Sequence, residues 1–192
     1  MIFIVSGGRG AGKSTLCRRL AAAAAARGLS PGGILAPGIF DSDGRKTGFH
    51  AESAGSGERR LLAEDSGAAP HPPEGGPRWG RFVFRADAFA WAIEVLRRDI
   101  DAGKSPVFID EIGPLEMERR KGFFPVFASI RRDPPAALVI VVRPELLREV
   151  RALFGGAGPR IFTVPSGGRD DEDLFTEEVL RAAAAPEGKA PA

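Results

Sequence analysis

The sequence lacks asparagine, glutamine and tyrosine altogether. A reaction that needs an amide or a phenol side chain is therefore excluded. The lack of glutamine rules out the water-positioning Gln of Ras-like GTPases. The lack of asparagine rules out the Asn-Lys-x-Asp element by which such GTPases select guanine. If the chain acts on a nucleotide, it must recognise that nucleotide and activate water with other groups.

Cysteine and histidine are scarce as well, with Cys17 as the one cysteine and His50 and His71 as the two histidines. A single thiol cannot form an internal disulfide, and this set is too small for a structural zinc site. One free thiol, without a signal peptide or an apolar run long enough to cross a membrane, predicts a cytoplasmic protein with no membrane partner. The net charge of +2 is too small to indicate a nucleic-acid partner.

Hydrophobic periodicity predicts an α/β fold. Strands that alternate with helices near both ends of the chain favour a parallel sheet covered by helices, and the β-rich centre adds antiparallel strands at one edge. Strands are predicted at 2–6, 33–40, 47–50, 58–63, 81–85, 107–109, 136–142 and 160–164, and helices at 13–27, 87–102, 122–132, 144–154 and 170–185.

The length of the chain suits one domain, which we expect over 1–185. Residues 65–78 are rich in proline and glycine and predict a mobile surface loop, which would also offer a surface to a protein partner. Residues 186–192 predict a disordered tail. We expect a monomer or a weak oligomer.

The segment that follows the first strand matches the phosphate-binding P-loop, or Walker A motif, G-x-x-x-x-G-K-[ST]. Its glycines let backbone N–H groups face phosphate oxygens, and the following helix adds the positive end of its dipole. We predict that Lys13 reaches the β- and γ-phosphates and contributes to catalysis, and that the Ser14 hydroxyl binds Mg²⁺. The predicted phosphate-binding residues are Gly7, Gly8, Arg9, Gly10, Ala11, Gly12, Lys13, Ser14 and Thr15.

Two acids follow the apolar strand at 107–109, in the manner of a Walker B motif. The carboxyl ends of parallel strands open onto the ligand crevice of such folds. We predict that Asp110 holds Mg²⁺ through water and that Glu111 activates or orients the attacking water. Because the chain has no glutamine, Glu111 is the best candidate for the catalytic base. Cys17, one turn beyond Ser14, is expected to be a buried apolar residue.

The stretch Asp-Glu-Ile-Gly-Pro-Leu-Glu at 110–116 resembles the small P-loop nucleoside-triphosphatases of archaea, thermophilic bacteria and animals, also called cancer-related nucleoside-triphosphatases. The segments 45–49, 81–93 and 165–170 resemble further parts of that family in the same order. The resemblance implies a RecA-like fold, Mg²⁺ dependence, and slow hydrolysis of ATP, GTP or another NTP with low base selectivity.

The resemblance also implies a nucleotide contact from Arg169, which would pack against the base or the phosphates. Gly167 and Gly168 stand where the family has Glu and Asn. Any side-chain contact from these two positions is therefore lost, and the resemblance does not extend to base recognition.

Two other functions stay open. In a nucleoside or nucleotide kinase, residues 40–78 would form the acceptor site. In a nucleotide-regulated adaptor for cofactor assembly, the bound NTP would set the conformation and hydrolysis would reset it.

Several side chains near the motifs also allow two interpretations. Arg143 is either a γ-phosphate sensor or a surface arginine, and Thr47 and Phe49 belong either to a plain edge strand or to a substrate contact. We expect Trp79 and Trp91 to serve in packing.

Overall fold

The computed structural model describes residues 1–67, 76–154, 158–164 and 169–185, without the side chain of Arg169. Most of the predicted loop at 65–78 and all of the predicted tail at 186–192 lie outside the described residues. The strands are β1 (Ile2–Gly7), β2 (Gly32–Leu35), β3 (Gly38–Phe40), β4 (Lys46–Ser53), β5 (Arg59–Asp65), β6 (Arg78–Trp79), β7 (Phe82–Phe84), β8 (Val107–Ile112), β9 (Leu138–Val142) and β10 (Arg160–Val164). The helices are α1 (Lys13–Ala26), α2 (Ala86–Asp101), α3 (Pro114–Met117), α4 (Phe124–Arg132), a 3₁₀ turn η1 (Pro144–Leu146), α5 (Leu147–Leu153) and α6 (Arg169–Ala184).

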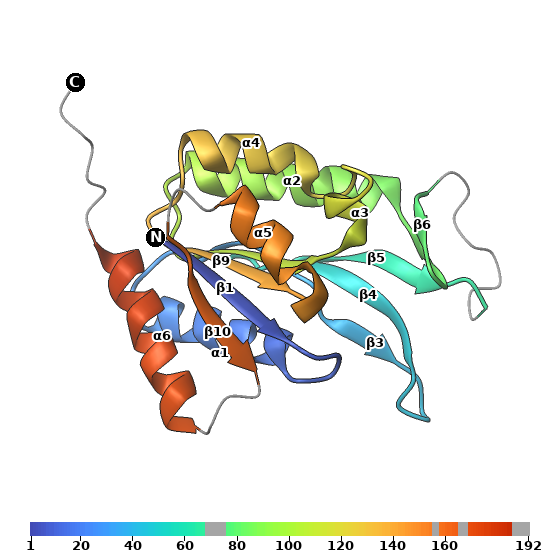
Figure 1. The fold of residues 1–192 in the computed structure, drawn as a ribbon, viewed down its shortest axis with the longest axis horizontal. Helices are drawn as coiled ribbons and strands as arrows, with labels where there is room; N and C mark the ends of the chain where they lie inside the picture. Colours follow the sequence, from blue (N-terminus) through green and yellow to red (C-terminus); the bar gives the residue numbers. More distant parts are fainter. Residues whose placement is uncertain (68–75, 155–157, 165–168, 186–192) are drawn as a thin grey trace.

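All the described strands belong to one sheet, in the order β10-β1-β9-β8-β2-β4-β5-β7-β6, with β3 paired to β4 (Figure 1). The five strands from β10 to β2 are parallel, and β4, β5, β7 and β6 continue the sheet as antiparallel strands. This confirms the expected α/β fold with antiparallel strands at one edge. The antiparallel part is larger than a single hairpin.

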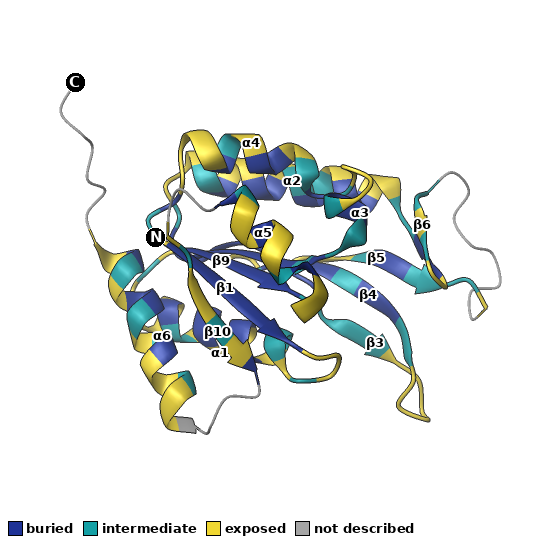
Figure 2. Ribbon diagram, viewed as in Figure 1, coloured by how far each residue is buried: buried dark blue, intermediate teal, exposed yellow. Residues whose placement is uncertain are grey.

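Helices cover both faces of the sheet, as Figure 1 shows, with α2, α3, α4 and α5 on one face and α1 and α6 on the other. The alternation of side chains along β1 serves both layers. Ile2 and Ile4 join the core under α2, α4 and α5, whereas Phe3 and Val5 join the core under α1 and α6. The central strands are buried along their whole length in Figure 2, in keeping with their continuous apolar sequence.

The sheet topology places the site. β9 lies between β1, which precedes the phosphate loop, and β8, which carries the two acids. The register pairs Ser6 and Ile112 with Val142 from opposite sides. Because the three strands are parallel, their carboxyl ends meet at one edge, where the site can form.

The structure differs from the sequence-based expectation in three places. The segment 33–40 divides into β2 and β3 at Ala36 and Pro37, because Pro37 has no N–H for the sheet ladder. β8 continues past Asp110 to Ile112. A short helix, α3, begins at Pro114, where no helix was predicted. None of the described helices is long and apolar enough to cross a membrane.

Candidate active site

The phosphate loop joins β1 to α1 at the carboxyl end of the sheet. Gly7 lies so close to β10 that a Cβ there would come 2.0 Å from the Val164 carbonyl oxygen. Gly12 has φ 94° and precedes α1 in a left-handed conformation that glycine adopts without strain. Lys13 Nζ donates hydrogen bonds to the carbonyls of Gly7 (2.7 Å) and Gly8 (2.8 Å), so its ammonium group lies across the loop.

The amino end of α1 suits an anion. Among the described side chains none caps this end, and its first turn contains no acid. The N–H groups of the first turn therefore remain available to phosphate oxygens, and the helix dipole favours negative charge there. The loop residues from Arg9 to Thr15 all line a cleft of about 430 Å³, a size typical of small-molecule sites.

Asp110, which precedes Glu111 in β8, is fully buried. Its Oδ2 accepts a hydrogen bond from the N–H of Ala36 at 3.1 Å, which the break between β2 and β3 makes available. Its Oδ1 has no hydrogen-bond partner within the described part of the chain. Burial, and then the charge of Glu111, raises the pKa of Asp110 to about 6, while Ala36, the Ser14 hydroxyl and Lys46 act in the opposite direction.

Glu111 points into the cleft because β8 is irregular at this residue. The pairing of β8 with β9 shifts its register between Ile109 and Ile112. Glu111 has φ 67°, a left-handed conformation that costs a non-glycine residue about 1 kcal/mol or more. A bulge of this kind redirects a side chain that the regular pleat would send elsewhere. As a result, Asp110 is buried, whereas the adjacent Glu111 lines the cleft.

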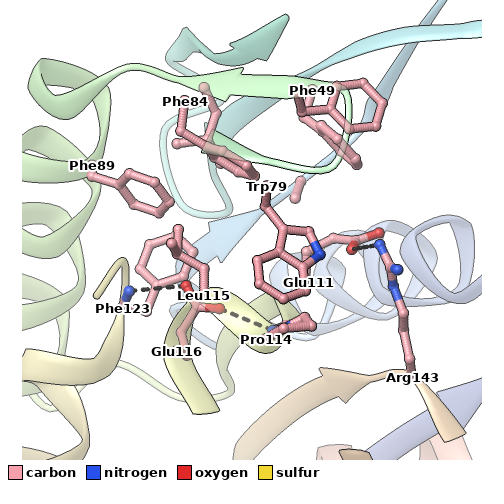
Figure 3. Close-up of a pocket in the computed structure, with 14 residues that line it drawn as sticks. Phe49, Trp79, Phe84, Phe89, Glu111, Pro114, Leu115, Glu116, Phe123 and Arg143 are labelled. Atoms are coloured by element: carbon pink, nitrogen blue, oxygen red, sulfur yellow. Dashed lines mark hydrogen bonds and ion pairs between the residues drawn. The ribbon is translucent and has the colours of Figure 1, made fainter. Parts of the chain in front are cut away.

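Two cations contact the Glu111 carboxylate. Lys46 Nζ, from the start of β4, lies 3.8 Å from Oε1, and Arg143 Nη2, directly after β9, lies 3.7 Å from Oε2. Figure 3 shows the Arg143 contact. The sequence left the role of Arg143 open and did not single out Lys46. The Arg-Lys-Thr-Gly-Phe segment at 45–49 was the available signal for Lys46, but only the folded hairpin brings it to the site.

A second, apolar cavity of about 50 Å³ adjoins Glu111 on the side away from the phosphate loop. Figure 3 shows Trp79 and several phenylalanines around it. Glu116, which is 3% exposed, lies at its base and accepts hydrogen bonds from the N–H groups of Gly113 (2.9 Å) and Phe123 (3.2 Å). Trp79, which was expected to serve in packing, forms part of the wall of this cavity.

The remaining predicted residues can be located as well. Cys17 is buried, as expected, and burial raises the pKa of its thiol. Phe49 lines both cavities, and Thr47 donates its hydroxyl to the Ile39 carbonyl within the β3–β4 hairpin. Arg169 is the first residue of α6, but its side chain, like Gly167 and Gly168, lies outside the described residues.

The fold and the site together define a P-loop nucleotide-binding protein. The sequence model of a family described as NTPase matches residues 2–176. The chain is 31% identical over 157 residues to the nucleoside-triphosphatase THEP1 of Pyrococcus abyssi, covering 80% of each chain, and 25% identical over 169 residues to that of Thermofilum pendens, covering 88% of each. The chain belongs to this NTPase family, which confirms the resemblance read from 110–116 and the expected enzyme class.

Solved structures confirm the fold. The structure of THEP1 from Aquifex aeolicus superposes with a TM-score of 0.69 at 22% identity, covering 96% of this chain and all of the other. The solution structure of a human cancer-related nucleoside triphosphatase superposes with a TM-score of 0.64 at 23% identity, covering 96% of this chain and 98% of the other. The α/β fold, with its mostly parallel sheet and antiparallel strands at one edge, therefore matches the fold of these structures.

Proposed function

We propose that this protein hydrolyses nucleoside triphosphates to the diphosphate and phosphate in a Mg²⁺-dependent reaction with broad base tolerance. The observation that carries the proposal is that two adjacent acids have different environments. Asp110 is buried, and one of its oxygens receives no hydrogen bond from the described residues. Glu111 projects from a bulge into the cleft that the phosphate loop lines. We further propose that 1–185 forms one cytoplasmic catalytic unit.

The residues present fit a magnesium site. The described residues contain no cluster of three or more potential His, Cys, Asp or Glu ligands. Mg²⁺ in phosphoryl-transfer enzymes needs few protein ligands, because water and substrate phosphates supply the rest. The free Oδ1 of Asp110 and the Ser14 hydroxyl, which lies close enough to influence the pKa of Asp110, would hold the ion. The metal would neutralise charge on the β- and γ-phosphates.

The protein groups then have separate roles. The loop N–H groups and Lys13 bind the phosphates, with Lys13 exchanging its carbonyl partners for phosphate oxygens. Glu111 accepts a proton from the attacking water as the water oxygen bonds to the γ-phosphorus. The bond from that phosphorus to the β-phosphate oxygen breaks, and the diphosphate leaves. Broad base tolerance is supported by the lack of Asn and Gln in the sequence and by Gly167 and Gly168.

Replacement of Glu111 tests the proposal. The Glu111→Gln protein should bind NTP at least as tightly as the wild type and lose turnover by about 10² or more, because the amide cannot accept the proton. Glu118→Gln, an exposed position in the same segment, is the matched control and should leave turnover unchanged. The measurement is phosphate release with each common NTP, with and without Mg²⁺. Undiminished hydrolysis by Glu111→Gln would exclude Glu111 as the base.

The cavity beside Glu111 bears on the alternative of a kinase. Its volume of about 50 Å³ gives room for a few water molecules and is far too small for a nucleoside. This cavity therefore admits water next to Glu111 and excludes a nucleoside from that position. Transfer of ³²P from γ-labelled NTP to an added nucleoside, in competition with phosphate release, would show the opposite.

Two features remain for other experiments. We propose that Arg169 contacts the nucleotide and that the 65–78 segment is the surface for a protein partner, as an adaptor would require. A pull-down whose result changes between NTP and NDP would support the second idea. Equal recovery with both nucleotides, or with the loop deleted, would count against it.

A further inference from the structure

We propose that Lys46 and Arg143 bind the γ-phosphate, and that their exchange between Glu111 and that phosphate lets the site distinguish NTP from NDP. This inference rests on the proposed hydrolysis, since it concerns the same site. It assigns a function to Lys46, which the sequence did not single out, and decides between the two interpretations of Arg143.

The first support is the convergence of two cations from separate elements. Lys46 begins β4 and Arg143 follows β9, yet each lies within 4 Å of a different oxygen of Glu111. Neither contact is short enough to be a hydrogen bond, because the distances are 3.8 and 3.7 Å. Long, partly exposed pairs of this kind are weak. The two cations can therefore leave Glu111 at little cost when a more highly charged anion is offered.

The second support is the charge of the cleft. Its lining contains six cationic side chains and a single carboxylate, Glu111. Asp110 is buried and does not line the cleft, and Arg81 is already paired with Asp65. The surplus of positive charge has no counterpart among the described residues of the lining, and it matches a triphosphate. The six cations are Arg9, Lys13, Arg45, Lys46, Arg81 and Arg143.

The third support is that neighbouring residues hold the Lys46 side chain in position. Its ammonium lies 3.6 Å from the centre of the Phe49 ring. Arg81 donates a hydrogen bond to the Lys46 carbonyl, which fixes the backbone. Gly38 leaves the necessary space, since a Cβ at that residue would come 2.7 Å from Lys46 Cε. Side chains held in this way meet a transition state with little reorganisation. Burial lowers the pKa of Lys46, so a new anionic partner would also relieve its loss of hydration.

The consequence is a site that responds to the third phosphate. A γ-phosphate at the mouth of the loop offers more charge than a carboxylate and draws Lys46 and Arg143 towards it. Glu111 then loses its two cationic neighbours at the moment when an attacking water needs a base. A diphosphate does not extend to these cations, so Glu111 keeps them.

The experiment compares binding of a triphosphate analogue with a non-hydrolysable β,γ-imido bridge against binding of NDP, both with Mg²⁺. Lys46→Met keeps the apolar stem on Phe49 and removes the charge. We expect it to weaken triphosphate binding about ten- to a hundredfold and NDP binding less than about threefold. Turnover should fall by about 10² or more. Arg143→Met should show the same selectivity, and Lys46→Arg should recover most of the triphosphate affinity.

Controls separate this inference from folding and from the proposed function. Lys121→Met removes an exposed lysine away from the cleft and should change nothing. Both affinities are measured without turnover, so an inactive wild type would refute the hydrolysis proposal and leave this comparison intact. Equal losses of triphosphate and NDP affinity in Lys46→Met and Arg143→Met would overturn the inference, as would wild-type turnover in Lys46→Met.

Discussion

Glu116 shows how a single buried carboxyl can make stability depend on pH. Burial raises its pKa from 4.5 to about 7, while hydrogen bonds from the N–H groups of Gly113 and Phe123 oppose the rise. Gly122 is required beside it, because a Cβ there would come 2.0 Å from Glu116 Oε1. The carboxyl thus connects the turn after Glu111 to the start of α4.

The direction of the pH effect follows from the two pKa values. Between about pH 4.5 and about pH 7 the folded protein binds more protons at Glu116 than the unfolded chain. The free energy of unfolding therefore falls as pH rises through this window and levels off above it. Relative to Glu116→Gln, which does not titrate, the wild type should lose up to about 3 kcal/mol between pH 5 and pH 8.

Urea unfolding of both proteins across this range measures the difference. Groups that titrate in both proteins, Asp110 among them, largely cancel in the comparison. Parallel pH profiles for wild type and Glu116→Gln would show that Glu116 does not titrate in this window.

Among the individual residues of the site, the sequence predicts those whose roles follow from local patterns. The phosphate loop and the Asp110–Glu111 pair are contiguous motifs, so their spacing alone identifies them. Lys46 could not be found in this way, because it approaches Glu111 only when the β3–β4 hairpin pairs into the sheet. The left-handed backbone at Glu111 was equally hidden, because it depends on the register shift against β9.

Among the elements, α2 and β2 are joined by Asp99. This carboxylate is fully buried, accepts the Gly33 N–H at 3.0 Å and lies 2.8 Å from Lys104 Nζ. β2 in turn packs tightly on β8, since a Cβ at Gly33 would meet the Phe108 carbonyl oxygen at 2.2 Å. Asp99 therefore adds a polar link between α2 and β2 to the apolar packing of Phe89, Val95 and Leu96.

Asp99→Ala should lower the free energy of unfolding by about 3 kcal/mol, because a buried N–H and a partly buried ammonium lose their partner. Asp99→Asn should cost less, since its oxygen can still accept from Gly33. Asp101→Ala, at the exposed end of the same helix, should stay within about 0.5 kcal/mol of wild type. Chemical denaturation measures the free energy of unfolding of the three variants. A similar small loss for all three would show that Asp99 does not hold α2 to β2.

Elements with a clear period were predictable from the sequence. α1 was expected to end before Gly28, and that glycine has φ 74° directly after the helix. α3 escaped prediction because its four residues are too few for a period, and its start depends on the Glu116 carboxylate reaching back to the Gly113 N–H. The hydrogen bond from the Ala36 N–H to Asp110, at the break between β2 and β3, likewise joins distant segments and could not be predicted from local sequence.

Nucleotide binding should raise the free energy of unfolding of the whole molecule. The phosphate loop, the end of β8 and the β3–β4 hairpin line one cleft, so an NTP would contact parts that are far apart in the chain. Glu111→Gln, which should hold NTP without turnover, is the protein to use. At a hundred times its Kd, Mg²⁺-NTP should raise the free energy of unfolding by about 2.7 kcal/mol.

The measurement is denaturant unfolding with Mg²⁺ or with EDTA at the same NTP concentration. The gain should be smaller in EDTA, because Asp110 and Ser14 then have no ion to share with the phosphates. An equal gain in both conditions would remove the metal from the proposed site.

The general architecture was predictable from the alternation of strands and helices, whereas the strand order was not, because it depends on contacts between distant segments.

The position of β9 between β1 and β8 also decides when the site comes into existence during synthesis. β1 is translated first, but its partners in the sheet are β9 and β10, which are among the last strands to be made. At about 5–20 residues per second, the ribosome needs several seconds or more between them. Through that interval the phosphate loop has been made but lacks the strand that aligns it with Asp110 and Glu111. A nascent chain should therefore remain unable to capture NTP until β9 has left the ribosome.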